Sequence, residues 1–172
     1  MGKPIDFVHE GRQVRFCCRG CVPKFKANPE QYLAEVDKKI VEAQKKSYPI
    51  NYCVLSNEKL DESAKDVVYN NRLIRLCCGG CVRKLNKDPQ SIVKKLDSAI
   101  TKVQTGNYPL AKCVISDENL GENYKRLIVG NTLIKICCKG CVPKVLADPS
   151  KYIKKVQSAK KAAAKEKKAS TT

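Results

Sequence analysis

The chain has 172 residues, with 34 Lys and Arg against 17 Asp and Glu, a net charge of +17, 11 cysteines and no Trp. Its mean hydropathy is −0.41, and no apolar run approaches the roughly 18 residues of a membrane-spanning helix, which excludes an integral membrane protein. Few aromatic side chains are present to build one large core, and an odd number of cysteines cannot form a closed set of disulfides. The composition therefore favours thiolates that bind metal.

The sequence repeats with a period of 60 residues. The motif Cys-Cys-x-Gly-Cys begins at Cys17, Cys77 and Cys137, and Tyr-Pro, Leu-Ile and Asn/Asp-Pro pairs recur with it. We therefore divide the chain into a metal-binding repeat that is truncated at its N-terminus, two full repeats and a basic Ala/Lys-rich tail. These segments are 1–47, 48–107, 108–159 and 160–172.

Each repeat is predicted to contain a β-hairpin that ends in the cysteine cluster. In the second repeat, Val67-Val68-Tyr69 and Leu73 to Leu76 are apolar and β-branched, and Asn70-Asn71 between them suits the positive φ angles of a tight turn. Glu10-Gly11 and Gly130-Asn131 stand at the same place in the other repeats.

Helical periodicity begins at the last cysteine of each cluster. Asn28, Asp88 and Asp148 interrupt it, each followed by Pro, which predicts an N-cap and the start of a second, longer helix. The basic segment after the third repeat could extend the last helix, but we expect it to fray into a solvated tail. The fold class expected is α+β, with three tandem small units, each a Cys-bearing turn, a β-hairpin and one or two helices.

The predicted elements bring four thiols of each full repeat together. Cys53 lies on the turn, Cys77 and Cys78 end the hairpin, and Cys81 follows one helical turn later. A unit of this size rarely has a sufficient core of its own, and a metal can supply the missing stability. Thiolates select Zn(II), our first candidate, or Cu(I) or another thiophilic metal. The candidate ligands are Cys17, Cys18, Cys21, Cys53, Cys77, Cys78, Cys81, Cys113, Cys137, Cys138 and Cys141.

The spacing of Cys53, Cys77 and Cys81 resembles that of the TRASH or YHS-type heavy-metal-binding domain, and so does the Asn/Asp-Pro-x-x-aromatic sequence that ends at Tyr32 and Tyr152. The resemblance implies a small treble-clef-like fold and a role in metal sensing, trafficking or resistance. The turn reads Cys-x-x-Ser, so a four-cysteine site would have to recruit the additional thiol Cys18, Cys78 or Cys138.

Three other interpretations of the cysteines and of the single His remain open. The clusters could be zinc sites that only stabilise the fold. Redox chemistry at the adjacent Cys pairs is less favoured, because a thioredoxin-like Cys-x-x-Cys in a βαβ context is missing. His9 is expected on the surface of a strand rather than as a ligand. No catalytic set is recognisable, so we expect a protein that is not an enzyme.

The positive charge raises the question of an anionic partner. A basic protein with zinc modules could bind nucleic acid or another anion, and this is our alternative function. Lys outnumbers Arg, and aromatic residues are not interleaved with the basic ones as in a base-stacking surface, so solvated helix faces explain most of the charge.

The start of the chain yields one more expectation. Alignment of Ile5 with Leu60 and Leu120 makes the first hairpin five residues shorter than the others and places Met1 at the position of Ser56. We therefore expect the natural reading frame to continue upstream, with a Cys three residues before Met1. A true start with a three-thiol first repeat is the alternative. The compartment stays open between the cytoplasm and, if an export signal lies upstream, a bacterial periplasm.

Overall fold

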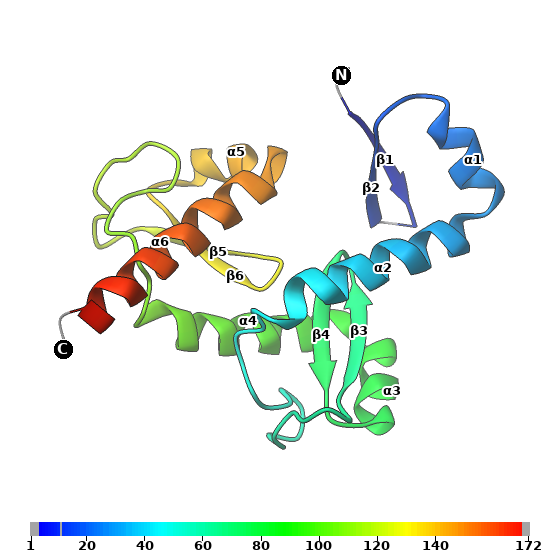
Figure 1. The fold of residues 1–172 in the computed structure, drawn as a ribbon, viewed down its shortest axis with the longest axis horizontal. Helices are drawn as coiled ribbons and strands as arrows, with labels where there is room; N and C mark the ends of the chain where they lie inside the picture. Colours follow the sequence, from blue (N-terminus) through cyan, green and yellow to red (C-terminus); the bar gives the residue numbers. More distant parts are fainter. Residues whose placement is uncertain (1–3, 11, 170–172) are drawn as a thin grey trace. The chain divides into compact units, whose positions relative to one another are not determined.

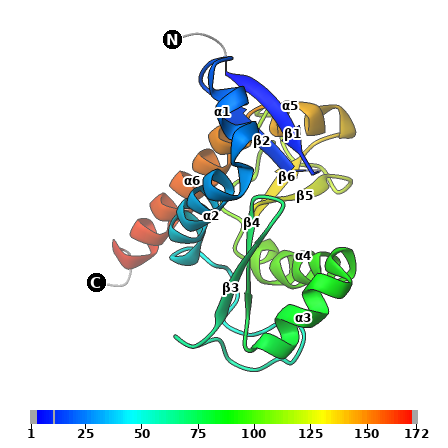
Figure 2. The same ribbon diagram turned by 90° about the vertical axis from the view of Figure 1, so that its right-hand side faces the viewer.

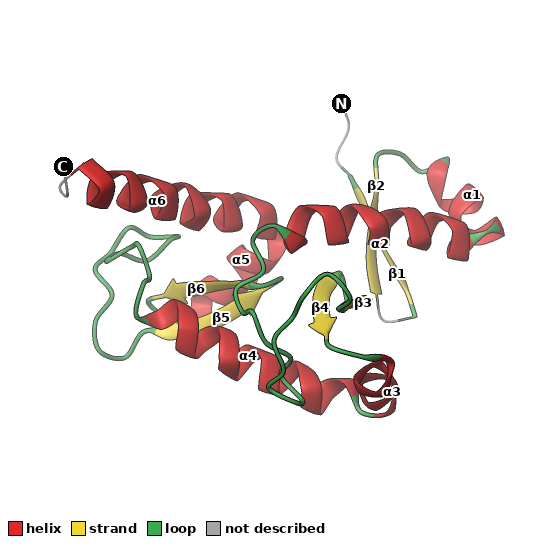
Figure 3. Ribbon diagram, turned by 60° about the horizontal axis from the view of Figure 1, so that its bottom comes forward, coloured by secondary structure: helices red, strands yellow, loops and turns green. Residues whose placement is uncertain are grey.

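The computed structural model describes residues 4–10 and 12–169. It is a mixed α+β structure with three small two-stranded antiparallel sheets, each beside a cysteine cluster and followed by helices (Figures 1 and 3). The predicted fold class of three small α+β units is confirmed. The chain divides into two compact units, Met1–Ile92 and Val93–Thr172. The predicted repeat boundaries stay a prediction.

The elements follow the 60-residue period. The first repeat contains β1 (Ile5–His9), β2 (Arg12–Phe16), α1 (Cys21–Ala27) and α2 (Pro29–Lys45). The second contains β3 (Lys65–Tyr69), β4 (Arg72–Leu76), α3 (Gly79–Lys87) and α4 (Pro89–Thr105). The third contains β5 (Lys125–Val129), β6 (Thr132–Ile136), a 3₁₀ turn η1 (Lys139–Cys141), α5 (Val142–Ala147) and α6 (Pro149–Ala169).

The turns of the second and third hairpins lie where they were predicted, and at the first turn Glu10 has a φ of 48°, while Gly11 lies outside the described residues. Asn70 and Asn71 have φ angles of 48° and 60°, and Gly130 has a φ of 58°. Two consecutive left-handed residues match the twist of a two-residue hairpin turn, and Asn and Gly adopt this conformation at low cost. The turn chemistry therefore positions the two ends of each hairpin, and with them the cysteines.

The predicted helix starts are also confirmed. The side chain of Asn28 accepts a hydrogen bond from the Gln31 amide, Asp88 accepts one from Ser91, and Asp148 accepts one from Lys151. A side-chain oxygen at the N-cap satisfies an otherwise unpaired amide of the first turn, and the following Pro has no amide to satisfy. Each repeat thus holds a short helix at the cysteines and a long helix after it.

The first hairpin is not shortened, which corrects the alignment of Ile5 with Leu60. Ile5 pairs with Phe16 just as Lys65 pairs with Leu76, and the strands have the same length in both repeats. Ile5 is therefore the counterpart of Lys65, in line with the 60-residue period. The apolar character of Ile5 fits its place on the partly buried face of β1, which also carries Phe7.

The long helix α2 packs on the hairpin of the second repeat. It contacts both β3 and β4, and α3 contacts the same strands (Figures 1 and 2). Leu73, Ile74 and Leu76 are fully buried as a result. In the first repeat β2 alternates between partly buried and exposed residues, with Gln13 and Arg15 exposed. The two strands differ in burial because only one face of β2 is covered, whereas both faces of β4 are covered.

The second compact unit has its own apolar cluster. Ile134, Ile136 and Val145 are fully buried, and Val156 of α6 packs with them. Cys113 and Cys141 belong to the same cluster. The cysteines of this repeat therefore form part of its core and are not surface additions.

The basic segment after the third repeat extends α6 through Ala169, so the expected fraying is not seen in the described part of the tail. Ala, Lys and Glu are strong helix formers, and no Pro or Gly interrupts them. Residues 170–172 lie outside the described range. None of the helices in the described ranges has both the length and the apolar character that crossing a membrane requires.

Candidate metal centres

Cys53 lies on a tight turn shaped by its own backbone. The Cys53 amide donates to the Glu58 carbonyl at 2.8 Å, and the Asn57 amide donates to the Cys53 carbonyl at 2.8 Å. Asn57 has a φ of 62°, which Asn tolerates better than most residues. The third repeat builds the same turn around Cys113, with Asp117 at a φ of 57°. The turn directs backbone amides toward the thiol it carries.

The other thiols come from the end of the hairpin and the start of the following helix. Cys77 follows β4 directly, Cys78 is the N-cap of α3, and Cys81 lies in its first turn. The Cys81 amide donates to the Cys78 carbonyl at 3.1 Å. The hairpin therefore returns the chain to the turn of Cys53, as the sequence predicts.

In the second repeat Cys53, Cys77 and Cys81 form a triad. Their sulfur atoms lie within 4.8 Å of one another, and the Cys77 and Cys81 sulfurs are 3.7 Å apart. Cys53 is 0% exposed and Cys81 is 5% exposed, whereas Cys77 is partly exposed. Cys113, Cys137 and Cys141 reproduce this triad in the third repeat, with 3.7 Å between the sulfurs of Cys137 and Cys141.

The first repeat forms its triad from different positions. Cys17, Cys18 and Cys21 have their sulfurs within 4.8 Å of one another, with 3.4 Å between Cys18 and Cys21. Cys17 and Cys18 are exposed, and Cys21 is partly exposed. In this repeat the second cysteine of the motif belongs to the triad, and the described residues contain no counterpart of Cys53.

Cys78 and Cys138, which were predicted as candidate ligands, are exposed and lie outside the triads of their repeats. They remain close to the triads. The Cys78 sulfur is 3.6 Å from that of Cys77, and the Cys138 sulfur is 3.9 Å from that of Cys141. Each full repeat therefore has a triad and one additional exposed thiol beside it.

The turn thiols ionise most readily. Burial opposes ionisation of Cys53, but hydrogen bonds from the backbone of Cys77 and Leu55 outweigh it and lower the pKa of this thiol to about 7. Burial also opposes ionisation of Cys113, but hydrogen bonds from the backbone and the hydroxyl of Ser116 outweigh it and lower the pKa of this thiol to about 6. A thiolate is the form of cysteine that binds metal. One thiol of each buried triad therefore ionises near neutral pH, before any metal binds.

The other triad thiols are harder to ionise without a cation. Burial raises the pKa of Cys81, and burial together with Cys137 raises that of Cys141 to about 12. A hydrogen bond with the Glu58 side chain raises the pKa of Cys77. Three thiolates so close together repel one another, so a bound cation would stabilise all three.

The serine of each Cys-x-x-Ser turn lies beside the triad. The Ser56 hydroxyl is 3.2 Å from the Cys77 sulfur, and the Ser116 hydroxyl is 3.5 Å from that of Cys137. A cysteine here would complete a four-thiolate site. The triad itself instead offers three thiols, with a serine hydroxyl beside Cys77 or Cys137.

The donor set fits a thiophilic metal ion. An ion held tetrahedrally at about 2.3 Å from each sulfur separates the sulfurs by about 3.8 Å. The Cys77 and Cys81 sulfurs, and those of Cys137 and Cys141, are 3.7 Å apart, which is close to this value. The third sulfur of each triad lies within 4.8 Å of both. All three triads are thus positioned to bind a metal ion.

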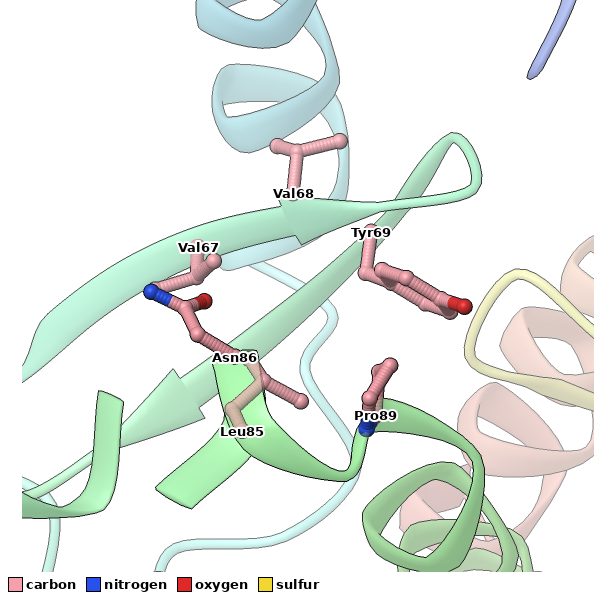
Figure 4. A pocket seen from close by; sticks show the side chains of 6 residues that line it. All are labelled: Val67, Val68, Tyr69, Leu85, Asn86 and Pro89. Carbon is pink, nitrogen blue, oxygen red and sulfur yellow. The ribbon is translucent and has the colours of Figure 1, made fainter. Parts of the chain in front are cut away.

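Two other features do not contribute metal ligands. His9 is partly buried with its ring 5.3 Å from that of Phe25, edge to face, and belongs to none of the clusters among the described residues. A pocket beside β3 and the start of α4 contains no cysteine (Figure 4). It is lined by Val67, Val68, Tyr69, Leu85, Asn86 and Pro89.

Sequence reasoning missed the residues that support the hairpins. The Tyr48 hydroxyl accepts a hydrogen bond from the Arg75 amide at 3.1 Å, and Tyr108 accepts one from Lys135 at 3.0 Å. Burial raises the pKa of both phenols. The recurrence of Tyr-Pro with the 60-residue period was a signal for this role, but the pattern alone did not reveal the partner.

Comparison with protein-family models, with curated proteins and with solved structures gives no match to this chain. The resemblance to TRASH or YHS-type domains therefore rests on the cysteine motif and the Asn/Asp-Pro helix starts. The structure adds that the cysteines of each repeat come together in a cluster of their own.

Proposed function

We propose that the protein handles a thiophilic metal ion as cargo, binding one ion in each cysteine triad, in metal trafficking, sensing or resistance. The observation that carries the proposal is the triad of Cys53, Cys77 and Cys81, repeated as Cys113, Cys137 and Cys141. Zn(II) is the first candidate ion, with Cu(I) or another thiophilic metal as the alternatives. Nothing in the proposal requires catalysis, so we regard the protein as a binding protein and not an enzyme.

The number of thiols favours handling over a purely structural role. Structural zinc sites are almost always closed by four protein ligands. Each buried triad here supplies three thiols and has a serine hydroxyl where the fourth thiol would stand. Three ligands leave one position for a donor from outside, which a protein that receives or delivers an ion needs.

Elemental analysis of the full chain, purified without added metal, tests this function. We expect about one ion for each of the three triads, and protection of their nine thiols against a thiol reagent. A metal-free protein that also fails to bind added Zn(II) or Cu(I) would contradict the proposal. A closed site with four thiolates per ion would assign the metal to fold stabilisation instead.

A second candidate function, binding of a nucleic acid or other anionic partner, is favoured by one strand pair. Asp6 pairs across the strands with Arg15, and Asp66 with Arg75. Both pairs form salt bridges, at 2.7 and 2.8 Å. The counterpart in the third repeat is Arg126 opposite Lys135, two positive charges facing each other.

Tyrosines surround this like-charged pair. The Arg126 guanidinium donates to the Tyr124 hydroxyl at 3.0 Å, and the Lys135 ammonium lies 4.7 Å from the ring centre of Tyr108 and 4.8 Å from that of Tyr124. Like charges directly opposite each other on a hairpin are destabilising. A negatively charged group of a partner, such as a phosphate, would offset this repulsion.

Arg126→Asp tests this second function, because it restores the charge pair of the other repeats. Binding to a labelled single-stranded oligonucleotide should weaken by about tenfold, because two phosphate-contacting charges are lost. Lys144→Glu, at an exposed position of α5, makes the same change in net charge and serves as the control. Equal losses in the two variants would assign the binding to overall charge, and no binding by the unmodified protein would exclude this function.

A further inference from the structure

Each full repeat contains two overlapping sets of three thiols that share two members. Cys77 and Cys81 belong to the triad completed by the buried Cys53. The same two cysteines stand beside the exposed Cys78, whose sulfur is 3.6 Å from that of Cys77. We call Cys53, Cys77 and Cys81 the inner set, and Cys77, Cys78 and Cys81 the outer set.

The third repeat has the same two overlapping sets of thiols. Cys137 and Cys141 are shared, Cys113 is buried at 0% exposure, and Cys138 is exposed with its sulfur 3.9 Å from that of Cys141. Both full repeats thus place an exposed thiol at the edge of a buried triad.

The first repeat shows that the outer positions can gather as a triad. Cys17, Cys18 and Cys21 are the counterparts of Cys77, Cys78 and Cys81, and their sulfurs lie within 4.8 Å of one another. The corresponding glycine stands before the third cysteine in every repeat, and a Cβ at Gly80 would lie 3.6 Å from the Cys78 sulfur. The glycine therefore lies directly beside that thiol.

We propose that the outer set is a loading site, in which Cys78 and Cys138 receive the metal ion and pass it to the buried Cys53 and Cys113. This inference rests on the proposed metal-binding function. The inner thiols Cys53 and Cys81 are almost inaccessible to solvent, so an ion held by a donor outside the protein meets the exposed thiol first. Cys77 and Cys81 keep hold of the ion while the third ligand changes.

The exchange is balanced at every step. Bonds from the sulfurs of Cys77, Cys78 and Cys81 to the ion form as the bonds from the outside donor break, and the proton of each thiol passes to solvent. The Cys53 sulfur then binds, giving any proton it carries to solvent, and the Cys78 sulfur leaves and regains a proton. The metal keeps its oxidation state throughout. Release to an acceptor follows the same steps in reverse.

The rate of metal exchange tests the proposal separately from metal binding. The full chain is loaded with Zn(II), and transfer to an excess of a chromogenic chelator is followed by stopped-flow absorbance. Cys78→Ser with Cys138→Ser should retain the metal content and an affinity within about threefold of the unmodified protein, and transfer should slow by about tenfold or more. Cys53→Ser with Cys113→Ser should lose affinity and release its metal faster.

The outcomes separate the two proposals. An unmodified chain that binds no metal would overturn the proposed function and the loading site together. Normal metal content with an unchanged transfer rate in the Cys78/Cys138 variant would overturn the loading site alone. Loss of the metal from that variant would also overturn it, because Cys78 and Cys138 would then be permanent ligands of four-thiolate sites. The change in rate at constant metal content is the supporting result.

Discussion

The side-chain amide of Gln44 bonds to the β3–β4 turn and to the start of β4, through the backbone of Asn71 and of Leu73. Its Nε2 donates to the Asn71 carbonyl at 3.1 Å, and its Oε1 accepts from the Leu73 amide at 3.0 Å. Gln104 makes the same pair of bonds to Asn131 and Leu133. A glutamine near the end of α2 and of α4 therefore holds the hairpin of the next repeat, and each of these hairpins leads into a cysteine triad.

Gln44→Ala should destabilise the second hairpin. The Leu73 side chain is 0% exposed, and a buried amide that loses its partner costs about 1–3 kcal/mol. Chemical denaturation followed by circular dichroism measures the loss. Gln90→Ala, at an exposed position of α4, is the matched control and should change the stability by less than about 0.5 kcal/mol. Equal effects of the two variants would contradict the role of Gln44.

The thiols should react with an alkylating reagent in an order set by their exposure. In the metal-free protein Cys18, Cys78 and Cys138 should react first, since they are exposed and their pKa values are lowered, mainly by hydrogen bonds from Cys21, from the Cys81 backbone and from Cys137 respectively. Cys53 and Cys113 should react last despite their low pKa, because they are fully buried. Mass spectrometry of timed samples gives the order, and early labelling of Cys53 would show that the turn opens freely.

The local parts of the fold could be predicted from the sequence because their signals lie within a few residues. Asn70-Asn71 specifies a turn, and Asp88-Pro89 specifies a helix start, whatever surrounds them. The 60-residue period then extends each local prediction to the other repeats. The convergence of the cysteines follows, because a hairpin must return the chain to its beginning.

The remaining features depend on contacts that are distant in the sequence. The packing of α2 on the second hairpin joins elements of two repeats. The sequence around Gln44 or Leu73 contains no local pattern that predicts the hydrogen bond between them. The alignment of Ile5 went wrong because apolar character was given more weight than the period. The position of Cys78 outside the triad depends on its side-chain conformation, which spacing alone does not determine.

Metal removal should affect the repeats unequally. The hairpins and short helices of the second and third repeats should lose protection against hydrogen exchange when a chelator is added, because the thiols belong to their cores. The first repeat should change less. Its Phe25 is 1% exposed and lies 5.3–6.2 Å, between ring centres, from the rings of Phe7, Phe16 and Tyr32.

Peptide-level hydrogen exchange by mass spectrometry distinguishes the repeats in one experiment. Phe25→Ala is the converse variant, since it removes the aromatic core and should expose the first hairpin with or without metal, at a cost of about 3–5 kcal/mol. Unchanged exchange of residues 65–85 and 125–145 after complete metal removal would show that the metal does not support the fold.

Metal affinity should fall steeply as the pH falls, because protons compete for the thiolates. Near pH 8 the Cys53 thiol, with its pKa of about 7, is already ionised, whereas the raised pKa values of Cys77 and Cys81 keep these thiols protonated. Binding then releases about two protons per ion, so each decrease of one pH unit lowers the apparent affinity by about a hundredfold. Below pH 6 Cys53 is protonated too, and the slope should rise to about a thousandfold per unit.

Competition titrations with a chelator of known affinity, made between pH 5.5 and pH 8.5, measure this slope. Cys53→Ser provides the control, because a site without that thiol should keep the shallower slope down to the lowest pH. Ser56→Cys should have the opposite effect, since a fourth thiol beside Cys77 adds one more proton to the exchange and tightens the site. A slope of one proton per ion in the unmodified protein would mean that the triad does not bind metal through three thiolates.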